Sequence, residues 1–577
     1  MDYQTKFQFW LDHPQLDVET QQELANLTQT EREERFYKDL EFGTAGLRGV
    51  IGAGTNRMNF YTVAKAAEGY AQFFLSQGED FCARGLAVSY DSRHLSPEFA
   101  QLTARIFVDR GIKVYVSDEL RPVPMLSYAV RRFGCAGGVM ITASHNPKQY
   151  NGFKAYGEDG GQLAPQAADQ VAKFMNRVAD PISLYHQISD LDTARKSPLW
   201  HDLSSEFDED FNQMLLKLSI NPDVVKRQKD LKIVYTPIHG SGNKPVRRVL
   251  KSLGFEQVLV VKEQELPDEN FTTAPYPNPE TREALQLGLQ LMEESGADLL
   301  IGTDPDADRT GVAVRDHEGS LQVLSGNQIG ILLMEYILES KQQRGELPDK
   351  SFCVSTVVSS RLPQLIADHY GVDLTRVLTG FKYIGEQIKE RDEHGDEHFQ
   401  FGYEESFGYL AGTEVRDKDA VVSCMLIAEM AAVAADQGQT LYDRLQNIYK
   451  KYGYASEKTI AIAREGKSGS EKIAKFMQYL RENKADVLAP LAVESVTDYQ
   501  VGEHYDLTSG EKSEVDLPKS NVLIFNLSGI DWLCARPSGT EPKVKIYLGF
   551  YDTEQSLADA KLAIALEIID KIVESQL

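Results

Sequence analysis

The chain of 577 residues is too long for a single hydrophobic core, and a prior of about 150 residues per domain predicts about four domains. Its composition, 42% hydrophobic and 25% charged, is that of an ordinary globular protein. With 61 Lys and Arg against 86 Asp and Glu, the formal net charge of −25 argues against nucleic acid and against a membrane as partners. An anionic substrate would therefore need a locally cationic site.

The cysteines and the apolar stretches favour a cytoplasmic protein. Five scattered cysteines form no CxxC pair, so we expect reduced thiols: Cys82, Cys135, Cys353, Cys424 and Cys534. The first residues mix acids with aromatics and lack the apolar segment of a signal peptide. The longest apolar stretch, 424–435, contains Glu429 and is too short to span a bilayer, which predicts a buried core helix.

Along the chain, a polar, helix-prone segment over residues 1–40 leads into FGTAGLRG (Phe42–Gly49), and we expect its stretch TQTEREERFYKDLEF (28–42) to form a solvated helix. Short apolar runs then alternate with longer helical patterns, which indicates α/β units with parallel or mixed sheets. The predicted strands are GLAVSYD, KVYVSD, GGVMITA, LKIVYTPIHG, QVLVVKE, ADLLIGTD and SFCVSTVVSS. Several end in polar loops, where active sites of such sheets lie.

The last part of the chain changes character. Residues 522–552 hold closely spaced strands, and a long amphipathic helix is predicted from Glu554 to about Ser575, which indicates a smaller α+β domain. Linker signals near 181–198, 316–326 and 450–458 divide the chain. The predicted domains are 1–200, 201–322, 323–450 and 451–577.

Ser144 is the first residue with evident chemistry. It lies in TASHNP (Thr142–Pro147), directly after the apolar run GGVMI, so we expect it to be exposed on a sharp loop and able to carry a phosphoryl group. An ordinary loop serine or helix cap is the alternative for this motif alone. The neighbouring His145 could donate to a phosphate oxygen, and Lys154 could neutralise phosphate or shuttle protons.

A second motif, DPDADR, places Asp304, Asp306 and Asp308 at alternate positions after an apolar strand. Alternate residues of an extended segment face one way, so three carboxylates can converge on Mg²⁺, Mn²⁺ or Ca²⁺. An EF-hand is excluded because Arg309 and Arg315 occupy loop positions six and twelve. A solvated acidic turn is the remaining alternative.

The two motifs make sense together. A phosphoserine carries about −1.5 to −2 charges, and two unit charges 4 Å apart repel by roughly 4 kcal/mol at an effective dielectric constant near 20. Phosphorylated Ser144 could therefore lie beside the three aspartates only with a metal between them. Joined through Mg²⁺, the motifs predict phosphoryl transfer.

Two further loops suit a phosphorylated sugar. RPSGTEPK (Arg536–Lys543) combines a guanidinium, hydroxyls and a glycine as an anion-binding turn would, although a simple strand connection is an alternative. GYEESFG places Glu404 and Ser406 between glycines, which suits binding of vicinal sugar hydroxyls. Taken alone, such a sequence is more often a surface turn. His394 and His398, at helical spacing, are better explained as a solvated loop than as metal ligands.

Taken together, FGTAGLRG, TASHNP, DPDADR, GYEESFG and RPSGTEPK follow one another over about 500 residues. This order resembles the α-D-phosphohexomutase superfamily, and is most similar to its long phosphoglucomutase/phosphomannomutase branch. The resemblance implies an α/β protein of four domains around a central cleft, the first three with mixed sheets and the last a smaller α+β domain, each giving one loop to the site.

The resemblance also implies roles for individual residues. Ser144 would be the phosphoserine, and with Asp304, Asp306 and Asp308 it would hold Mg²⁺. The catalytic set would be Ser144, His145, Lys154, Arg48 and Lys418, the last matched with a one-residue shift. The substrate would be bound by Thr379, Gly380 and Lys382 in TGFKYIG, by Glu404 and Ser406, by Arg309, and by Arg536, Ser538, Gly539, Thr540 and Lys543. Tyr403 stands where the family's pattern has glycine.

The implied activity interconverts α-D-glucose 1-phosphate and α-D-glucose 6-phosphate through the phosphoserine and glucose 1,6-bisphosphate, which is also the activator. Phosphomannomutase, phosphopentomutase and sugar bisphosphate synthase activities are alternatives, as are a Mg²⁺-dependent sugar phosphatase and a non-catalytic sugar-phosphate sensor. The expected partners are small sugar phosphates. The general acid and base, the preferred sugar and the oligomeric state stay open at the level of sequence.

Overall fold

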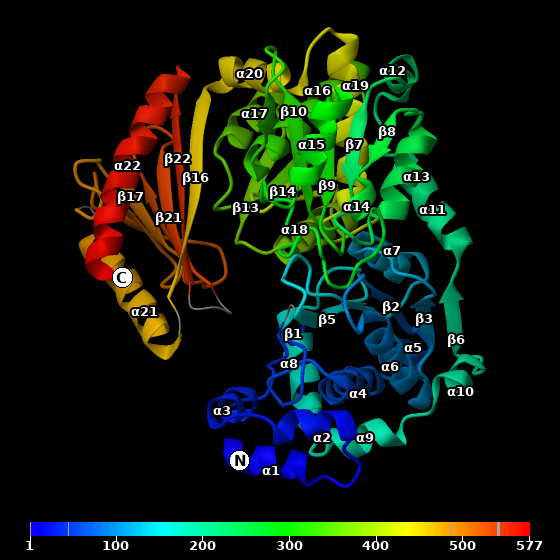
Figure 1. The fold of residues 1–577 in the computed structure, drawn as a ribbon. Helices are drawn as coiled ribbons and strands as arrows, with labels where there is room; N and C mark the ends of the chain where they lie inside the picture. Colours follow the sequence, from blue (N-terminus) through cyan, green and yellow to red (C-terminus); the bar gives the residue numbers. More distant parts are fainter. Residues whose placement is uncertain (1, 44–45, 465, 485, 539–542) are drawn as a thin grey trace. The chain divides into compact units, whose positions relative to one another are not determined.

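The computed structural model describes residues 2–43, 46–464, 466–484, 486–538 and 543–577. The chain divides into two compact units, which we describe separately. The first comprises residues 1–329 and 384–442, and the second comprises 330–383 and 443–577. Figure 1 shows the elements coloured along the chain.

The N-terminal segment forms three short helices with a small core of their own, α1 (Tyr3–Leu11), α2 (Val18–Ala25) and α3 (Gln29–Phe36). The helix predicted in the polar segment 28–42 is present as α3, and Phe36 is its one buried residue. A Thr28–Glu31 capping box begins α3, which supplies two of the unpaired N–H groups at this helix end with acceptors. The small core consists of side chains from all three helices, among them Trp10, Leu24 and Phe36, packed with Tyr61.

The first sheet has six strands in the order β1-β5-β4-β2-β3-β6, mixed in direction. The strands are β1 (Leu47–Val50), β2 (Leu86–Tyr90), β3 (Val114–Ser117), β4 (Gly137–Ile141), β5 (Tyr150–Tyr156) and β6 (Trp200–Leu203). The helices of this region are α4 (Phe60–Gln77), α5 (Glu79–Arg84), α6 (Ser96–Asp109), α7 (Val123–Arg132), α8 (Pro165–Met175), α9 (Pro181–Gln187) and α10 (Leu191–Arg195). Strands β2 and β4 are buried along their whole length, as expected for apolar parallel strands covered on both faces.

The second sheet has five strands in the order β11-β10-β9-β7-β8. These are β7 (Ile233–Thr236), β8 (Val258–Val260), β9 (Leu299–Thr303), β10 (Thr310–Arg315) and β11 (Leu321–Val323). Its helices are α11 (Ser205–Leu216), α12 (Pro222–Arg227), α13 (Asn243–Leu253), α14 (Lys262–Glu265) and α15 (Gln286–Ser295). The tight connection between antiparallel β9 and β10 is the DPDADR loop.

The rest of the first unit follows residue 384. It contains a π-helical turn η1 (Ile388–Glu393), the antiparallel pair β14 (His398–Glu404) and β15 (Gly408–Leu410), and the buried helix α19 (Ala420–Asp436). Helices α18 (Phe381–Gln387), α20 (Leu441–Tyr452) and α16 (Gly326–Arg344) cross the sequence boundaries between the units. The predicted buried core helix at 424–435 is therefore confirmed as part of α19.

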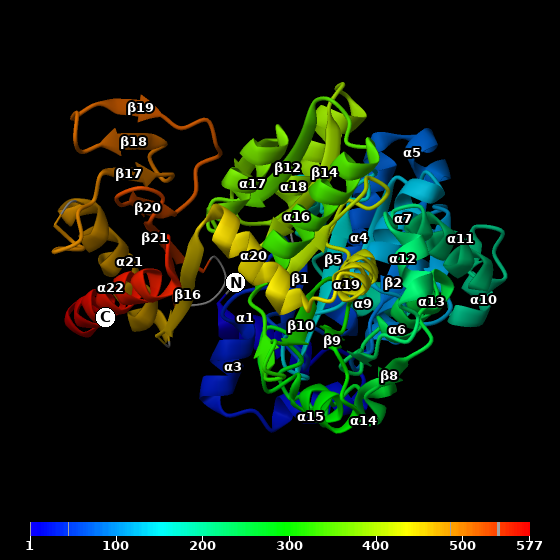
Figure 2. The same cartoon turned by 90° about the horizontal axis from the view of Figure 1, so that it is seen from above.

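The second unit joins a parallel strand pair to a large antiparallel sheet. The pair is β12 (Ser351–Thr356) and β13 (Asp373–Val377), connected by α17 (Leu362–Tyr370). The sheet has seven strands in the order β16-β22-β21-β20-β17-β18-β19. These are β16 (Tyr454–Ala463), β17 (Ser495–Asp498), β18 (Glu503–Asp506), β19 (Lys512–Glu514), β20 (Leu523–Asn526), β21 (Trp532–Pro537) and β22 (Lys543–Asp552). Helices α21 (Gly466–Asn483) and α22 (Gln555–Gln576) pack beside it (Figure 2).

The α/β class is confirmed, with mixed sheets followed by a β-rich last domain. Two of the segments with linker signals contain regular structure. In 450–458, Tyr454 begins β16, which pairs with β22 over ten residues. The segment 181–198 forms α9 and α10. The four domain boundaries stay predictions.

Among the described helices, none alone has the length and apolar character that a membrane span needs, and only the bent pair α19 and α20 meets the test jointly.

Candidate active site

Ser144 lies three residues beyond the end of β4, in a left-handed backbone conformation with φ of 50°. Its N–H donates to Thr142 Oγ1 at 2.8 Å, and its Oγ donates to Asp304 Oδ2 at 2.8 Å. The prediction of an exposed serine is wrong, since only 3% of Ser144 is accessible. The DPDADR loop and His145, whose Nδ1 lies 3.2 Å from Oγ, cover the hydroxyl.

Two buried residues that the motifs did not single out hold the Ser144 loop. The Arg93 guanidinium donates to the carbonyls of Ser144 and Asn146, and to those of Pro147 at 3.0 Å and Tyr150 at 3.2 Å. Asp91 accepts the hydroxyl of Thr142 at 2.6 Å. The only sequence signal was that Asp91 and Arg93 follow an apolar strand, since the contacts themselves join segments about fifty residues apart.

Asp304, Asp306 and Asp308 converge as predicted. All three are at most 1% exposed, and each offers a carboxylate oxygen within 4.8 Å of the others. The loop is stabilised by its own first carboxylate, because Asp304 Oδ1 accepts the N–H groups of Asp308 and Arg309, both at 3.0 Å. These hydrogen bonds hold the loop in the conformation in which the three carboxylates lie close together.

The donor set fits a hard divalent cation. Asp306 Oδ1 and Asp308 Oδ1 are buried without a hydrogen-bond partner, which is costly for a charged group unless something else neutralises it. Burial and then the charges of Asp306 and Asp308 raise the pKa of Asp304 well above its ordinary value. Burial would also raise the pKa of Asp306, but Lys154 lowers it below the usual range. A cation with oxygen ligands would relieve this crowding of negative charge.

Two lysines from different elements meet at the triad. Lys154 Nζ, on β5, lies 2.7 Å from Asp306 Oδ2 and 3.5 Å from Asp308 Oδ2. Lys418 Nζ, just before α19, lies 3.2 Å from the same Asp308 oxygen. Burial alone would lower both lysine pKa values, but the adjacent aspartates raise them above the ordinary value, so both side chains remain ammonium groups.

Arginines and a histidine complete the cluster. Arg48, on β1 beside β5, donates to Asn146 Oδ1 at 3.2 Å, and Arg309 forms an ion pair with Glu280. Burial and the nearby Arg309 and Arg48 lower the pKa of His145 well below its ordinary value, so the ring is neutral. A cavity of about 90 Å³ opens among these groups, lined by Arg48, Ser144, Lys154, Ala155, Gln162, Asp308, Arg309 and Lys418.

The predicted sugar loop adjoins the DPDADR loop. Glu404 ends β14 and is buried, and Phe407, at φ of 64°, accepts the N–H of Thr310 at 3.0 Å. This bond fixes the β14–β15 turn, with Ser406 partly accessible, beside the first residue of β10. Glu404 also contributes to the raised pKa values of Arg309 and Lys418, which places its charge near the cluster.

The remaining predicted residues belong to the second unit. Arg536 on β21 lies directly opposite Lys545 on β22, and Ser538 donates its N–H to the carbonyl of Lys543 at 2.8 Å, which closes a hairpin. Gly539 and Thr540 lie outside the described residues. Thr379 and Gly380 lie between β13 and α18, and Lys382 Nζ lies 4.7 Å from the ring centroid of Tyr383.

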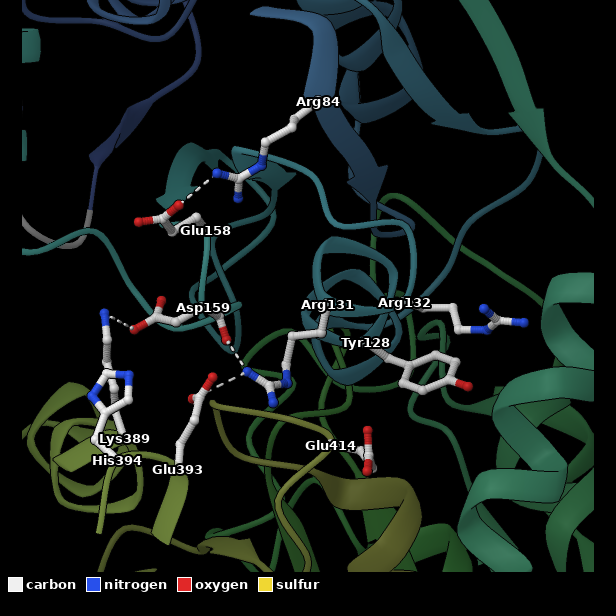
Figure 3. Close-up of a pocket in the computed structure, with 10 residues that line it drawn as sticks. All are labelled: Arg84, Tyr128, Arg131, Arg132, Glu158, Asp159, Lys389, Glu393, His394 and Glu414. Atoms are coloured by element: carbon white, nitrogen blue, oxygen red, sulfur yellow. Dashed lines mark hydrogen bonds and ion pairs between the residues drawn. The ribbon is translucent and has the colours of Figure 1, made fainter. Parts of the chain in front are cut away.

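A larger polar pocket of about 690 Å³ lies elsewhere in the first unit (Figure 3). Its lining mixes cations and acids: Arg84, Tyr128, Arg131, Arg132, Glu158, Asp159, Lys389, Glu393, His394 and Glu414. Dashed lines in Figure 3 mark Arg84 with Glu158, Lys389 with Asp159, and Arg131 with Glu393. Because these charges are paired and partly solvated, this pocket contrasts with the cluster around Ser144.

Comparison with known proteins decides the family. Residues 39–181, 209–319 and 325–452 match the phosphoglucomutase/phosphomannomutase α/β/α domains I, II and III. A phosphoglucomutase of Staphylococcus epidermidis strain RP62A is 40% identical over 526 residues, covering 91% of this chain and 93% of that protein.

The chain belongs to the phosphoglucomutase/phosphomannomutase family. It is therefore a phosphotransferase of the isomerase class.

Solved structures show the same fold in this family. The open form of the Paramecium phosphoglucomutase pp63/parafusin has a TM-score of 0.66 at 17% identity, covering 93% of this chain and 96% of that one. An N-acetylphosphoglucosamine mutase of Aspergillus fumigatus, solved with GlcNAc-6P and magnesium, has a TM-score of 0.50 at 15% identity, covering 94% and 96%.

Proposed function

We propose that this family member is a Mg²⁺-dependent phosphoglucomutase that interconverts α-D-glucose 1-phosphate and α-D-glucose 6-phosphate. The observation that carries the proposal is the 2.8 Å contact of Ser144 Oγ with Asp304 Oδ2, inside a buried triad with two unpartnered carboxylate oxygens. A serine placed there can exchange a phosphoryl group only where a cation balances the carboxylates. The name of the 40% identical staphylococcal relative supports glucose as the sugar.

The proposed cycle consists of two transfers. The Oγ–P bond of phospho-Ser144 breaks as a bond forms between phosphorus and the free hydroxyl of the hexose phosphate, whose proton passes to an acceptor in the site. The resulting glucose 1,6-bisphosphate turns around and returns its other phosphoryl group to Ser144 Oγ, with the leaving sugar oxygen taking a proton. Such transfers depend on positioning and charge neutralisation more than on covalent chemistry.

Asp304, Asp306 and Asp308 would hold Mg²⁺, which, when bound, would neutralise charge on the transferring phosphoryl group. Lys154, Lys418, Arg48 and Arg309 are placed to stabilise the phosphoryl oxygens. His145, Lys154 and Lys418 remain the candidates for moving the proton. The magnesium in the Aspergillus relative supports the choice of metal.

The sugar and its non-reacting phosphate are assigned to other loops. Glu404 and Ser406 would bind sugar hydroxyls, and Thr379, Gly380 and Lys382 would distinguish one orientation of the sugar from the other. Arg536, Ser538, Gly539, Thr540 and Lys543 would hold the non-reacting phosphate. The cross-strand pair of Arg536 and Lys545 supports this role, because two like charges facing each other are destabilising unless an anion joins them.

The deciding experiment is a substrate panel with Mg²⁺ and catalytic glucose 1,6-bisphosphate, comparing kcat/KM for the 1-phosphates of glucose, mannose, ribose and deoxyribose. We expect glucose 1-phosphate to be preferred and one phosphoryl group to appear on Ser144 by mass spectrometry. EDTA should abolish turnover, and added Mg²⁺ should restore it. Preference for another sugar, release of inorganic phosphate equal to substrate loss, or dependence on a separate phosphoryl donor would overturn the assignment.

A further inference from the structure

Asp417, the residue before Lys418, is buried beside the cluster although no motif gave it a role. It is 1% exposed, and both of its oxygens are engaged. Oδ1 accepts the backbone N–H of Lys418 at 2.9 Å and lies 3.3 Å from Lys418 Nζ. Oδ2 accepts the Tyr156 hydroxyl at 3.0 Å and Gln162 Nε2 at 3.2 Å.

These contacts join the segments that carry the two lysines. Tyr156 and Lys154 are two residues apart on β5, and therefore point to the same face of the sheet. Lys154 and Lys418 share Asp308, while Tyr156 and Lys418 share Asp417. The Lys418 ammonium thus lies between two carboxylates: Asp308, which also contacts Lys154, and Asp417, which also contacts Tyr156.

The carboxylate behind Lys418 is charged. Burial alone would raise the pKa of Asp417, but the ammonium groups of Lys418 and then Lys154, with hydrogen bonds from Lys418 N–H and Gln162, hold it below its ordinary value. The Tyr156 phenol stays protonated, because burial and then Asp417 raise its pKa well above its ordinary value. Tyr156 therefore keeps its proton and donates a hydrogen bond to the ionised carboxylate of Asp417.

The stem of Lys418 is guided by a glycine. A Cβ at Gly408, the last residue of GYEESFG, would lie 2.1 Å from Lys418 Cδ and 2.7 Å from its Cγ. The methylene chain therefore runs directly over the backbone at the start of β15, and any larger residue would displace it. Asp417 beside the Lys418 backbone and Gly408 along its methylene chain therefore both constrain the side chain whose ammonium contacts Asp308.

We propose that Asp417 is a positioning residue that holds the Lys418 ammonium against the reacting phosphoryl group. The inference rests on the proposed function, since it assigns Lys418 to that transfer. It gives the buried acid of VRDKDA a role, because Asp417 would still hold the Lys418 ammonium when a metal takes Asp308.

The two segments are also tied together independently of Asp417. Ser127 Oγ donates to the carbonyl of Gly160 at 2.7 Å and accepts the N–H of Arg416 at 2.9 Å. The ion pairs of Lys389 with Asp159 and of Arg131 with Glu393, both visible in Figure 3, add to this connection. The loop should therefore stay folded when Asp417 loses its charge.

The test is Asp417→Asn, with Asp208→Asn as matched control. Asp208 is similarly buried, at 6% exposed, and pairs with Arg121 at 2.7 Å away from the cluster. We expect Asp417→Asn to lower kcat by about 10- to 100-fold with KM within about twofold, as for other partners that orient a catalytic group. Asp208→Asn should lower Tm while leaving kcat unchanged.

A double-mutant cycle separates positioning from general stability. Tyr156→Phe removes a single donor to Asp417 and should lower kcat by about 3- to 10-fold, while the double variant should be no slower than Asp417→Asn alone, because both changes release the same lysine. Full kcat in Asp417→Asn, a loss confined to KM, or additive effects of the two changes would overturn the proposal.

A crystal structure of Asp417→Asn decides the inference without turnover. We expect the Lys418 ammonium to move away from Asp308, and an unchanged position would refute the proposed role. If the unmodified protein isomerises no sugar phosphate of the panel, the proposed function fails, but this structural comparison still tests the role of Asp417.

Discussion

Two groups of mixed charge in the first unit have opposite characters. Around Ser144, three aspartates and two lysines are buried, and two carboxylate oxygens have no hydrogen-bond partner. In the pocket of Figure 3, acids and cations are paired at a partly solvated surface, as in the contact of Arg84 with Glu158. The acids Glu158, Asp159 and Glu393 of the larger pocket are paired with cations, whereas two buried carboxylate oxygens of the triad have no hydrogen-bond partner. Buried carboxylate oxygens without such a partner, rather than the number of charged residues or the size of a cavity, distinguish the group around Ser144.

Among the variants that test this distinction, Ser144→Ala should have the largest effect. Removing the hydroxyl leaves the triad and lysines in place but eliminates the phosphoryl acceptor, so we expect kcat to fall by about 10⁴-fold or more. Steady-state assays with glucose 1-phosphate, Mg²⁺ and glucose 1,6-bisphosphate measure this. Turnover close to that of the unmodified enzyme would show that the buried group is not the reactive one.

Asp308→Asn should have the next largest effect. Asp308 contacts both lysines and contributes an oxygen without a hydrogen-bond partner, so we expect kcat to fall by about 10²- to 10³-fold and Mg²⁺ affinity by about 10- to 100-fold. A thermal-shift titration supplies a readout apart from turnover, because a ligand that binds the folded state raises Tm.

In that titration Mg²⁺ should raise the Tm of the unmodified protein and have little effect on Asp308→Asn. The matched surface change Glu158→Gln should keep the full Mg²⁺ shift. An equal shift in all three proteins would place the metal elsewhere.

Asp419 shares one property with each group: it is buried, like the aspartates around Ser144, and it has hydrogen-bond partners, like the acids of the pocket. It caps α19 by accepting the N–H groups of Val421 at 2.8 Å and Val422 at 2.9 Å, and burial raises its pKa to about 7. A raised folded-state pKa gives stability that is fully present below the ordinary Asp pKa of 3.8 and is lost as pH rises toward about 7.

We therefore expect Asp419 to lower the free energy of unfolding by up to about 1.4 kcal/mol per pH unit within that interval. Asp419→Asn, which keeps an acceptor for the cap, should lose this slope when denaturant unfolding is followed from pH 5 to pH 8. Parallel pH profiles for the two proteins would contradict the prediction.

The smallest effect is expected for Glu158→Gln itself. The ion pair with Arg84 is half-exposed, and such pairs contribute about 0 to 1 kcal/mol. We expect Tm and kcat/KM to stay close to those of the unmodified protein. A loss of activity comparable to that of Asp308→Asn would abolish the distinction between the two charged groups.

Sequence reasoning singled out the residues to which we assign chemistry but not the residues that hold them in place. Ser144 and the three aspartates were recognisable because residue type and spacing are local properties. Arg93 beneath the serine loop and Asp417 behind Lys418 act through contacts with distant segments, which spacing does not reveal.

Burial was also misjudged where polar sequence is covered by tertiary packing. Ser144 was expected to be exposed, but the DPDADR loop and His145 cover its hydroxyl. Strand β16 was overlooked for a related reason. This strand forms its backbone hydrogen bonds with β22, which lies about ninety residues later in the chain, so the local sequence alone does not reveal it.

The positive φ at Ser144 restricts which residue could replace this proposed nucleophile. Threonine offers the same hydroxyl, but a β-branched residue is strongly disfavoured in the left-handed region. Exchange of the nucleophile for threonine would thus combine correct chemistry with the wrong conformation, at a cost of about 1 to 3 kcal/mol that the loop would have to absorb or relieve by moving the oxygen. The residue that can serve as the proposed phosphate carrier is in this sense set by the main chain as much as by the side chain.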